Sequence, residues 1–470
     1  MKSKEEEEEE EEEEEFSKGE QLFNACENGD VEEVTKLLQN EQIKINWQND
    51  NEETPFYIAC KYGHLEVVKL LLNDNRADIN EANIDGTTPL YAACKKGYIE
   101  IVILLLNDKR IDINKIAKYE QTPFYVACER GHIKIVILLL NDERVDINKV
   151  EMYGRTPFYN ACFDGDVELV KLLLKDKRVD INQSEAGDHD DGRYRGATPF
   201  YSACYRREIE IVKLLLNDQR VDVNQGNDEG ETPLYTACEE DKIEMVKLLL
   251  NSNRVDINKS DNDGKTPFYI ACQQGHIEIA KLLLNDQRID INKATEKGST
   301  PFWIACKNGN VEIVKLLLND QRIDVNKGTG FHETPFYVAC CYEYIETVKL
   351  LLNDERVDIN KPDKENKTPF SIACVLGHIE VLEYILASRK EVNGNVRAGI
   401  EMAKKEGMER RYENEEQFQS KKRNYQNIIE LLESYENNPN EKRTKLRVQL
   451  GLAGKKKFYF LQFLFFFFFF

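Results

Sequence analysis

The dipeptide Thr-Pro recurs along the chain at a nearly fixed interval, and this regularity constrains the fold more than any other feature. Successive copies lie 34 residues apart, except for one interval of 42, and they begin at Thr54, Thr88, Thr122, Thr156, Thr198, Thr232, Thr266, Thr300, Thr334 and Thr368. A period of this length indicates a repeat architecture, in which each unit buries its apolar side against its neighbours. We therefore expect an elongated array of similar units.

Each unit contains the start and stop signals of two short helices. Thr followed by Pro favours a helix start, because the Thr side chain caps the first turn and Pro fits the first helical position. A glycine such as Gly63 then ends the first helix, since glycine accepts the left-handed conformation at little steric cost. Apolar residues such as Val67, Val68 and Leu71 supply the stripe of a second helix. Asp-Gly pairs such as Asp85-Gly86 predict a hairpin turn before the next unit.

One unit, from Thr88 to Asn114, reads TPLYAACKKGYIEIVILLLNDKRIDIN, and the others differ from it at a minority of positions. This unit resembles the ankyrin repeat, whose pattern opens T-P-L-H-x-A and continues through G-H-x-E-I-V-x-L-L-L to D-V-N. The resemblance covers roughly residues 20 to 392. It implies a mainly α fold, an ankyrin-repeat solenoid of stacked helix-turn-helix units with short β-hairpin fingers.

The units depart from the family pattern in three ways. The link after Leu-Leu-Leu is one residue longer than usual, which accounts for the period of 34 residues, and we interpret it as a surface loop variation. The His of T-P-L-H is mostly Tyr here, and its hydroxyl can still reach loop backbone. Three units replace the turn glycine by Arg207, Asp241 and Glu343. A left-handed side chain would be strained at these positions, and we expect the loops to relax out of that conformation.

The repeats divide the chain into four regions. Residues 1–18 are an acidic tail that we expect to be disordered, and residues 19–392 hold about eleven repeats, beginning with a capping repeat that lacks its leading hairpin. Residues 393–436 suggest a degenerate closing repeat, with helices at 398–405 and 425–435 around a charged insertion. Residues 437–470 form a basic and then Phe-rich tail.

The charge of the chain argues against nucleic acid as a partner. The formal net charge is −21, and without the eleven successive glutamates at residues 5–15 it is −10. No basic stripe of the kind that follows a phosphate backbone is evident. The glutamate run is either a solubilising tail or a segment that attracts basic partners. A start of this kind is unlike a secretory signal, which favours the cytoplasm or the nucleus.

Cysteine and histidine recur at fixed repeat positions, which favours structural roles. Eleven cysteines occupy one equivalent position per repeat, and only Cys341 is extra. Helices pack about 8 to 10 Å apart, too far for disulfides between equivalent positions, and single thiols in a ladder cannot gather four zinc ligands. We interpret them as small buried core residues. His64, His132, His276 and His378 follow the repeat glycine, and we expect them to bond loop backbone between units.

No nucleophile, cofactor or metal motif is found outside these positions. The sequence therefore predicts that the chain is not an enzyme and holds no cofactor and no metal. The ankyrin resemblance implies a concave surface made by the hairpin tips and the first helices, and we expect a scaffold or adaptor that binds a partner protein along that groove as a monomer.

Positions that vary between repeats are the candidates for partner contacts, because repeat-invariant positions build the core. Aromatic residues and arginine contribute most to interface energy. The candidates at fingertips are Trp47, Tyr119, Met152, Tyr153, Phe331 and His332, and those after the repeat cysteine are Phe163, Tyr205, Arg206, Cys341 and Tyr342. Neutral drift of exposed positions is the alternative for any one of them.

Three further segments leave two interpretations open. The insertion from Gly187 to Arg195 is either a recognition loop or a tolerated surface insertion. Ile103 and Ile137 replace the usual Lys of the second helix, and they form either an apolar contact or an exposed pair.

The segment from Phe458 to Phe470 is apolar except for Gln462, and as a helix it reaches only about 20 Å, short of a bilayer core. Its final run, Phe465 to Phe470, is either an artefact of translating a T-rich stretch or a shallow membrane-inserting tail. The latter gives an alternative function, a membrane-associated adaptor or host-directed effector.

Overall fold

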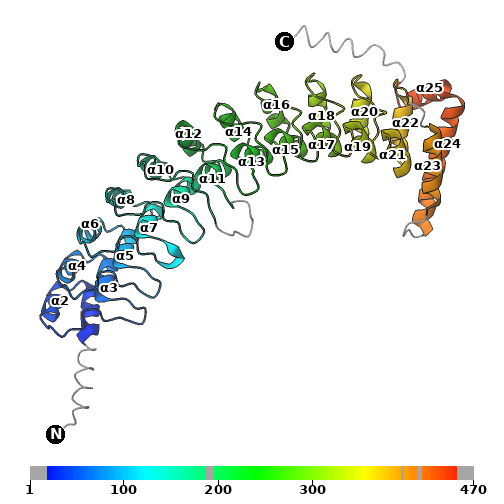
Figure 1. Cartoon of the computed structure of the whole chain (residues 1–470). Coiled ribbons are helices and arrows are strands. Elements are labelled where there is room, and N and C mark those ends of the chain that lie inside the picture. Colours follow the sequence, from blue (N-terminus) through cyan, green and yellow to red (C-terminus); the bar gives the residue numbers. More distant parts are fainter. Residues whose placement is uncertain (1–17, 187–194, 393–395, 410–414, 453–470) are drawn as a thin grey trace. The chain divides into compact units, whose positions relative to one another are not determined.

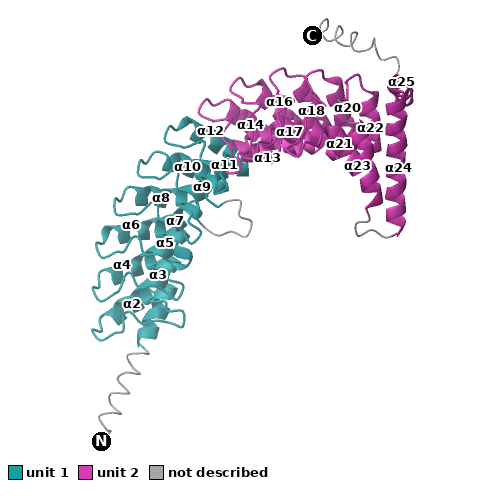
Figure 2. Cartoon of the chain, turned by 45° about the vertical axis from the view of Figure 1, so that its right-hand side comes forward, with its two compact units in different colours: residues 1–233 teal, residues 234–470 magenta. Residues whose placement is uncertain are grey.

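The computed structural model describes residues 18–186, 195–392, 396–409 and 415–452. These residues form a series of short helices in pairs (Figure 1). The chain divides into two compact units, residues 1–233 and residues 234–470 (Figure 2). In each unit the first helices of the repeats lie side by side in one row, and the second helices lie in another.

Unit 1 begins with a helix at 18–28, which pairs with the second helix α2 (Val31–Leu38). The first helices of its other repeats are α3 (Pro55–Tyr62), α5 (Pro89–Lys96), α7 (Pro123–Glu129), α9 (Pro157–Asp164) and α11 (Pro199–Arg206). Their second helices are α4 (Leu65–Leu72), α6 (Ile99–Asn107), α8 (Ile133–Leu140), α10 (Val167–Leu173) and α12 (Ile209–Asn217). A single 3-10 turn, η1 (Lys118–Glu120), lies in the finger before α7.

Unit 2 repeats the same pairing and then changes it at its end. Its first helices are α13 (Pro233–Glu239), α15 (Pro267–Gln274), α17 (Pro301–Lys307), α19 (Pro335–Cys341) and α21 (Pro369–Leu376). The second helices are α14 (Ile243–Leu250), α16 (Ile277–Asn285), α18 (Val311–Leu318), α20 (Ile345–Asn353) and α22 (Ile379–Ala387). Three longer helices follow: α23 (Val396–Met408), α24 (Glu415–Asn437) and α25 (Pro439–Gln449).

The predicted helix starts are confirmed. The Thr54 side chain accepts a hydrogen bond from the Tyr57 N–H at 3.1 Å, and Pro55 occupies the first helical position. The same cap is present at Thr88, Thr122, Thr156, Thr198, Thr266, Thr300, Thr334 and Thr368. A cap of this kind stabilises a helix by about 1 kcal/mol. It therefore defines the start of helices that are too short to be stable alone.

The helix ends predicted at the repeat glycines are confirmed, whereas the prediction for the residues that replace glycine is wrong. Gly63 has a φ of 82° at the end of α3, as predicted. The expectation that Arg207, Asp241 and Glu343 relax out of this conformation is wrong, because their φ values are 67°, 52° and 57°. The second helix must still return onto the first, and the Glu208 N–H accordingly bonds the Ala203 carbonyl at 2.9 Å. The packed helix pair therefore imposes the left-handed conformation on a side chain that disfavours it.

The fingers between repeats are turns without strands in the residues that the structure describes, so the expected β-hairpins are not present there. Within one finger the Asn83 N–H bonds the Thr87 carbonyl at 3.1 Å, and the Asn83 side chain closes the turn by accepting from the Thr87 N–H at 2.9 Å. Between fingers the Ile84 N–H bonds the Asn51 carbonyl at 2.9 Å. These hydrogen bonds within and between the fingers hold each finger in place, but they are too few to form the ladder of a β-sheet.

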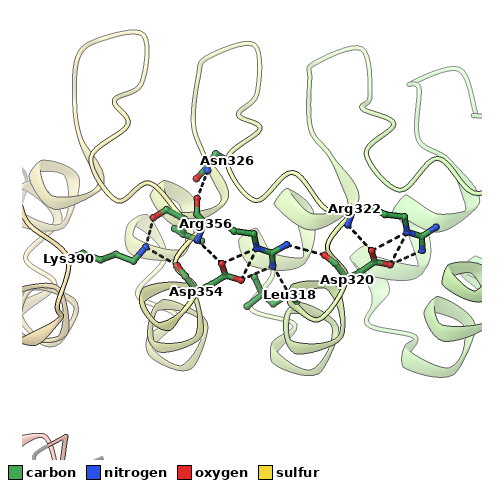
Figure 3. Close-up of polar contacts among 8 residues, drawn as sticks. Leu318, Asp320, Arg322, Asn326, Asp354, Arg356 and Lys390 are labelled. Carbon is green, nitrogen blue, oxygen red and sulfur yellow. Dashed lines mark hydrogen bonds and ion pairs between the residues drawn. The ribbon is translucent and has the colours of Figure 1, made fainter. Parts of the chain in front are cut away.

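In eight of the repeats an arginine joins the repeat to the one before it, as Figure 3 shows for Arg356. Arg356 donates through Nη2 to the carbonyl of Leu318 at the end of α18 and also to Asp354, each at 2.7 Å. These helix-terminal carbonyls lack a partner within their own helix, so the guanidinium satisfies them. The equivalent carbonyl is bonded by Arg76, Arg110, Arg144, Arg178, Arg220, Arg288 and Arg322.

The longer link lies at the surface, as we interpreted it, and the arginine staple gives it a second role. The link contains the Asp-x-Arg segment, and it therefore connects successive repeats. An asparagine beside it adds two more bonds, since Asn326 donates to the Arg356 carbonyl at 2.7 Å and accepts from the Asp358 N–H at 2.8 Å (Figure 3). Together these bonds fix the register of each repeat on the next.

The C-terminal helices continue the stack by different means. Helices α23 and α24 include the two segments where we expected helices, and α24 also takes up much of the charged insertion. Helix α25 lies in residues that we expected to be a tail. Its Arg443 and Arg447 donate to the Leu386 and Ala387 carbonyls at the end of α22, at 3.3 and 3.1 Å. The helix therefore supplies the staple that the next repeat would have provided.

No helix among the described residues has both the length and the apolar character needed to cross a bilayer. The glutamate run at residues 5–15 and the segment from Phe458 to Phe470 lie outside the described residues, and both remain as predictions.

The staple should make stability depend on the ionisation of its aspartates. Arg322 holds the pKa of Asp320 below its ordinary value. A depressed carboxyl pKa stabilises the fold above the unfolded-state pKa of about 3.9, and this stabilisation is lost as the pH falls through the folded-state pKa. We expect Asp320→Asn to cost about 1 kcal/mol at neutral pH, with a smaller difference from wild type at acid pH, in urea unfolding followed by circular dichroism. Glu312→Gln on the exposed face of α18 is the control, and equal losses from both variants would contradict the staple.

Helix α25 should stabilise unit 2 through its two arginines. Replacing Arg443 and Arg447 by Ala leaves the last carbonyls of α22 without these donors, and we expect a loss of about 1–3 kcal/mol in urea unfolding. The control variant replaces Lys442 and Lys445 of the same helix by Ala, which removes the same charge. If the lysine variant unfolds as easily as the arginine variant, charge and not carbonyl bonding explains the loss.

Candidate functional site

A group of aromatic and arginine side chains in unit 1 lies where α9 and α11 meet the finger between them. We name it the Phe163 cluster, and it consists of Arg155, Tyr159, Phe163, Glu185, Tyr205 and Arg206. Tyr159 and Phe163 lie one turn apart on α9, and Tyr205 and Arg206 end α11. The stacking of first helices brings these residues of two repeats together.

A buried carboxylate forms the base of the cluster. The Glu185 side chain has no solvent exposure and accepts from Arg155 Nη2 at 3.1 Å and from the Tyr159 hydroxyl at 2.7 Å. Its place is set by the finger, where the Glu185 N–H bonds the Ala197 carbonyl at 2.9 Å. Burial and the neighbouring Glu185 raise the pKa of Tyr159 far above its ordinary value, so this hydroxyl keeps its proton.

Two guanidinium groups lie close to the Phe163 ring. Arg155 is 5.1 Å and Arg206 is 4.8 Å from the ring centroid, and the Tyr159 ring stacks on Phe163 with centroids 6.3 Å apart. Each cation over an aromatic face contributes about 0.5–1 kcal/mol at a surface. Glu185 fixes Arg155 through their ion pair, and Arg155 in turn contacts the Phe163 ring. The ring is therefore held in position while part of it remains exposed.

A small polar hollow lies beside the cluster, between α7 and α9. Its volume is about 50 Å³, and it is lined in part by Tyr125, Glu129, Asn160 and Asp164. Asn160 donates to the Tyr125 hydroxyl, and burial raises the pKa of both Tyr125 and Asp164. A hollow of this size holds only a water or the end of one side chain. It adds a polar edge to an otherwise aromatic surface.

Three of the candidate residues predicted from the sequence come together in this cluster: Phe163, Tyr205 and Arg206. The remaining candidates lie outside the cluster, some of them next to one another, as Met152 is to Tyr153 and Phe331 to His332. Tyr119, Met152, Tyr153 and Phe331 are exposed at fingertips, Phe331 at 65%. His332 is exposed beside it, Tyr342 is exposed at the end of α19 and stacks on Tyr344, and Cys341 is partly exposed.

Trp47 does not form an exposed tip. Its ring packs edge-on against Phe23 of the first helix, with centroids 5.4 Å apart, and it lies against Gly19. In later repeats the equivalent position is often a lysine that bonds the asparagine carbonyl of the preceding repeat, as Lys115 does with Asn80 at 3.0 Å. The first repeat has no such predecessor, so an apolar ring covers the end of the stack instead.

Sequence reasoning missed Arg155, Tyr159 and Glu185. Tyr159 looked like a repeat-invariant core position, although its hydroxyl is what positions Glu185. Arg155 directly precedes a Thr-Pro pair, and Glu185 stands where other fingers have Asn49, Asn83 or Asn227. Both positions vary between repeats, and that variation was the available signal. The same variation between repeats could have indicated Ile84, a fingertip residue with 64% exposure, as a further candidate.

The structural roles predicted for cysteine and histidine are confirmed. Eleven cysteines are free and buried, and Cys341 alone is partly exposed. The Nε2 atoms of His64, His132, His276 and His378 lie 2.8 to 3.2 Å from a carbonyl of the preceding repeat. Among the described residues no group of three or more acidic, His or Cys side chains could hold a metal.

The tyrosines that replace the family histidine also connect repeats. Tyr91 donates to the Gln121 side chain at 2.9 Å and Tyr337 to Asp363 at 2.8 Å, so these hydroxyls bond finger side chains and not the expected backbone. Trp303 does reach backbone, at the Glu333 carbonyl. Residues 187–194 of the insertion lie outside the described residues, while Arg195 at its end pairs with Asp228 at 3.1 Å. Ile103 and Ile137 are exposed on α6 and α8, as predicted.

This fold defines the class of protein, a solenoid of stacked helix-turn-helix repeats. The family model for ankyrin repeats, which describes three copies, matches residues 22–117, 112–185, 181–261, 241–329 and 319–397. The chain therefore belongs to the ankyrin-repeat family. Ankyrin repeats generally bind other proteins, and proteins built from them are typically non-catalytic. A search of curated proteins found no match to this chain.

The cluster should depend on the charge of Glu185. Glu185→Gln removes the anion that neutralises Arg155 in a partly buried position, and we expect a loss of about 3 kcal/mol in thermal or urea unfolding. The control is Asp363→Asn at the same finger position in unit 2, where the carboxylate accepts from Tyr337 but the Arg155 position is Glu333. A loss no larger than that of the control would show that the Arg155 pair contributes little.

Proposed function

We propose that this chain is a non-catalytic scaffold that binds a partner protein across the first helices of unit 1, with the contact energy concentrated at the Phe163 cluster. The observation that carries the proposal is the Phe163 ring, whose centroid lies 5.1 Å from Arg155 and 4.8 Å from Arg206, with Arg155 itself paired to the buried Glu185 carboxylate. Ankyrin repeats are protein-binding modules, and aromatic and arginine side chains in well-packed surroundings contribute most of the energy at protein interfaces.

The arrangement lowers the entropic cost of binding. A side chain that becomes fixed at an interface costs about 0.5–1.5 kcal/mol. Phe163 and Tyr205 are already half-buried against neighbours, and Arg155 is 18% exposed and paired. A partner that covers this surface therefore orders few additional groups. The exposed arginine, Arg206, makes a cation–π contact with Phe163 and leaves its hydrogen-bond donors toward solvent.

Exposed fingertips extend the proposed surface along the repeats of unit 1. Tyr119, Met152 and Tyr153 lie on successive fingers, which are joined by the bond from the Met152 N–H to the Tyr119 carbonyl at 2.9 Å. Phe331, His332 and Tyr342 are further candidates in unit 2. The eleven buried free thiols support a reducing compartment, and we propose that the chain acts as a monomer in the cytoplasm or nucleus.

The test compares two double variants of the full chain. The chain is used to capture partner proteins, each is identified and purified, and its affinity is measured by calorimetry. We expect Phe163→Ala with Arg206→Ala to weaken binding by about 2–4 kcal/mol. The control is Ile103→Ala with Ile137→Ala, which removes exposed apolar side chains from the second helices of the same unit. A partner that binds the cluster variant as tightly as wild type, but not the control, would place the contact on the second helices and end the proposal.

A further inference from the structure

We infer that the first-helix face of unit 1 selects an acidic segment of the partner that also carries aromatic or aliphatic side chains. This inference rests on the proposed function and adds the chemistry of the ligand. It starts from the residues that follow each repeat cysteine, at the end of the first helix. In unit 1 the cations among them, which we call the basic row, are Lys61, Lys95, Lys96, Arg130, Arg206 and Arg207.

The basic row stands out from the rest of the protein. At the three positions after each repeat cysteine, unit 1 has six cations against three anions, whereas unit 2 has one cation, Lys307, against four anions. The whole chain has a net charge of −21. The second helices balance their charges locally, as in the pair of Lys69 with Glu66 at 2.6 Å. The first-helix face of unit 1 is therefore a region of opposite sign on an acidic molecule.

The fold does not require these cations. Basic residues near a helix C-terminus interact favourably with the helix dipole, and this could explain one or two of them. The first helices of unit 2 end equally well with Glu239, with Gln273 and Gln274, or with Leu376. The same helix pair thus forms with anions, amides or apolar side chains at these positions. The positive charge in unit 1 is consequently available for a ligand.

Several of these cations remain available in the structure. Lys61 pairs with Glu53 at 2.6 Å and Arg130 with Glu129 at 3.4 Å. Lys95, Lys96 and Arg207 are exposed and make no ion pair with any residue that the structure describes. Arg206 lies 4.8 Å from the Phe163 ring centroid, and its charge also acts on the Asp164 carboxyl, with which it makes no ion pair among the described residues. A carboxylate of a partner could therefore bind these groups without displacing an existing one.

Aromatic side chains alternate with the cations along the same face. Tyr62 is exposed at the end of α3, and Phe163 and Tyr205 are half-buried at the ends of α9 and α11. Lys61 lies over the Tyr62 ring at 5.6 Å. Cations alone would suit any polyanion, but the aromatic surface also favours apolar side chains. The combination fits a polypeptide in which acidic and apolar residues alternate.

A nucleic acid fits the same face less well. Phosphate backbones need a continuous positive track, and Glu129 and Asp164 interrupt the row between Lys96 and Arg206. The net charge of the chain repels a long polyanion more than a short acidic segment.

The test measures peptide binding to the full chain by fluorescence anisotropy. The probe is a fluorescein-labelled peptide of repeated Glu-Glu-Phe units, and the matched peptide has Gln-Gln-Phe units. We expect the glutamate peptide to bind roughly tenfold more tightly at low salt, and to lose this advantage as sodium chloride screens the charges.

Two charge-reversal variants locate the binding site. Lys95→Glu, Lys96→Glu and Arg206→Glu together should weaken the glutamate peptide by roughly tenfold or more. The control, Lys213→Glu, Lys247→Glu and Lys281→Glu together, makes the same change of net charge on the second helices and should leave the peptide bound. Equal loss in both variants overturns the inference because bulk charge then explains the binding. No loss in either variant also overturns it, because the peptide then binds without the basic row.

Other outcomes separate this inference from the proposed function. If both peptides bind equally and Phe163→Ala abolishes both, the acidic preference is wrong while partner binding at the cluster stands. Tighter binding of an oligothymidylate, in competition with the glutamate peptide, also overturns the inference. A rise in peptide affinity after deletion of residues 5–15 supports the inference, since it would mean that these glutamates compete with the peptide for the basic row in the full chain.

Discussion

No repeat of this chain can cover its own apolar side, and every other feature follows from that constraint. The helices from α2 to α22 have seven to nine residues, too short to persist alone in water. Phe56, Cys60 and Val68 are fully covered only because the neighbouring repeats lie against them. Small side chains, Ala59 and Cys60, let the first helices approach, and the buried cysteines need no disulfide to contribute. The row of repeats is therefore the smallest structure that can be stable.

Polar bonds between repeats give this apolar stack a defined register. Apolar contacts alone would tolerate a sliding of one repeat on the next, because they have little directionality. The arginine staple and the histidine after the turn each bond a backbone carbonyl of the preceding repeat, and the asparagine beside the staple bonds a carbonyl of the following repeat. At the C-terminal end the same acceptors are taken by Lys390 and by the arginines of α25. The closing helices thus satisfy the end of the stack chemically as well as covering its apolar side.

The Phe163 cluster shows how a binding surface can arise within a structure that repeats. Its helices start and end as all the others do, and only the side chains at variable positions differ. Glu185 replaces a finger-closing asparagine, and Arg155 precedes Thr156, so one repeat supplies the buried anion and its own cation across a finger. Arg206 arrives from the next repeat and completes the contact with Phe163. The proposed binding surface thus uses positions at which the repeat fold accepts different side chains.

The sequence by itself determined the repeats, their helices and their caps, because Thr-Pro, glycine and the apolar stripe act within a few residues of one another. It also indicated Phe163, Tyr205 and Arg206, since these positions vary between copies. Tertiary structure decided what lies beyond that local range. Stacking brings Arg155 to Glu185 across 30 residues, turns a longer link into a staple, and holds Arg207 in a left-handed conformation that its side chain disfavours. Neither spacing nor propensity contains these features, because each depends on helices or fingers that come together only in the folded array.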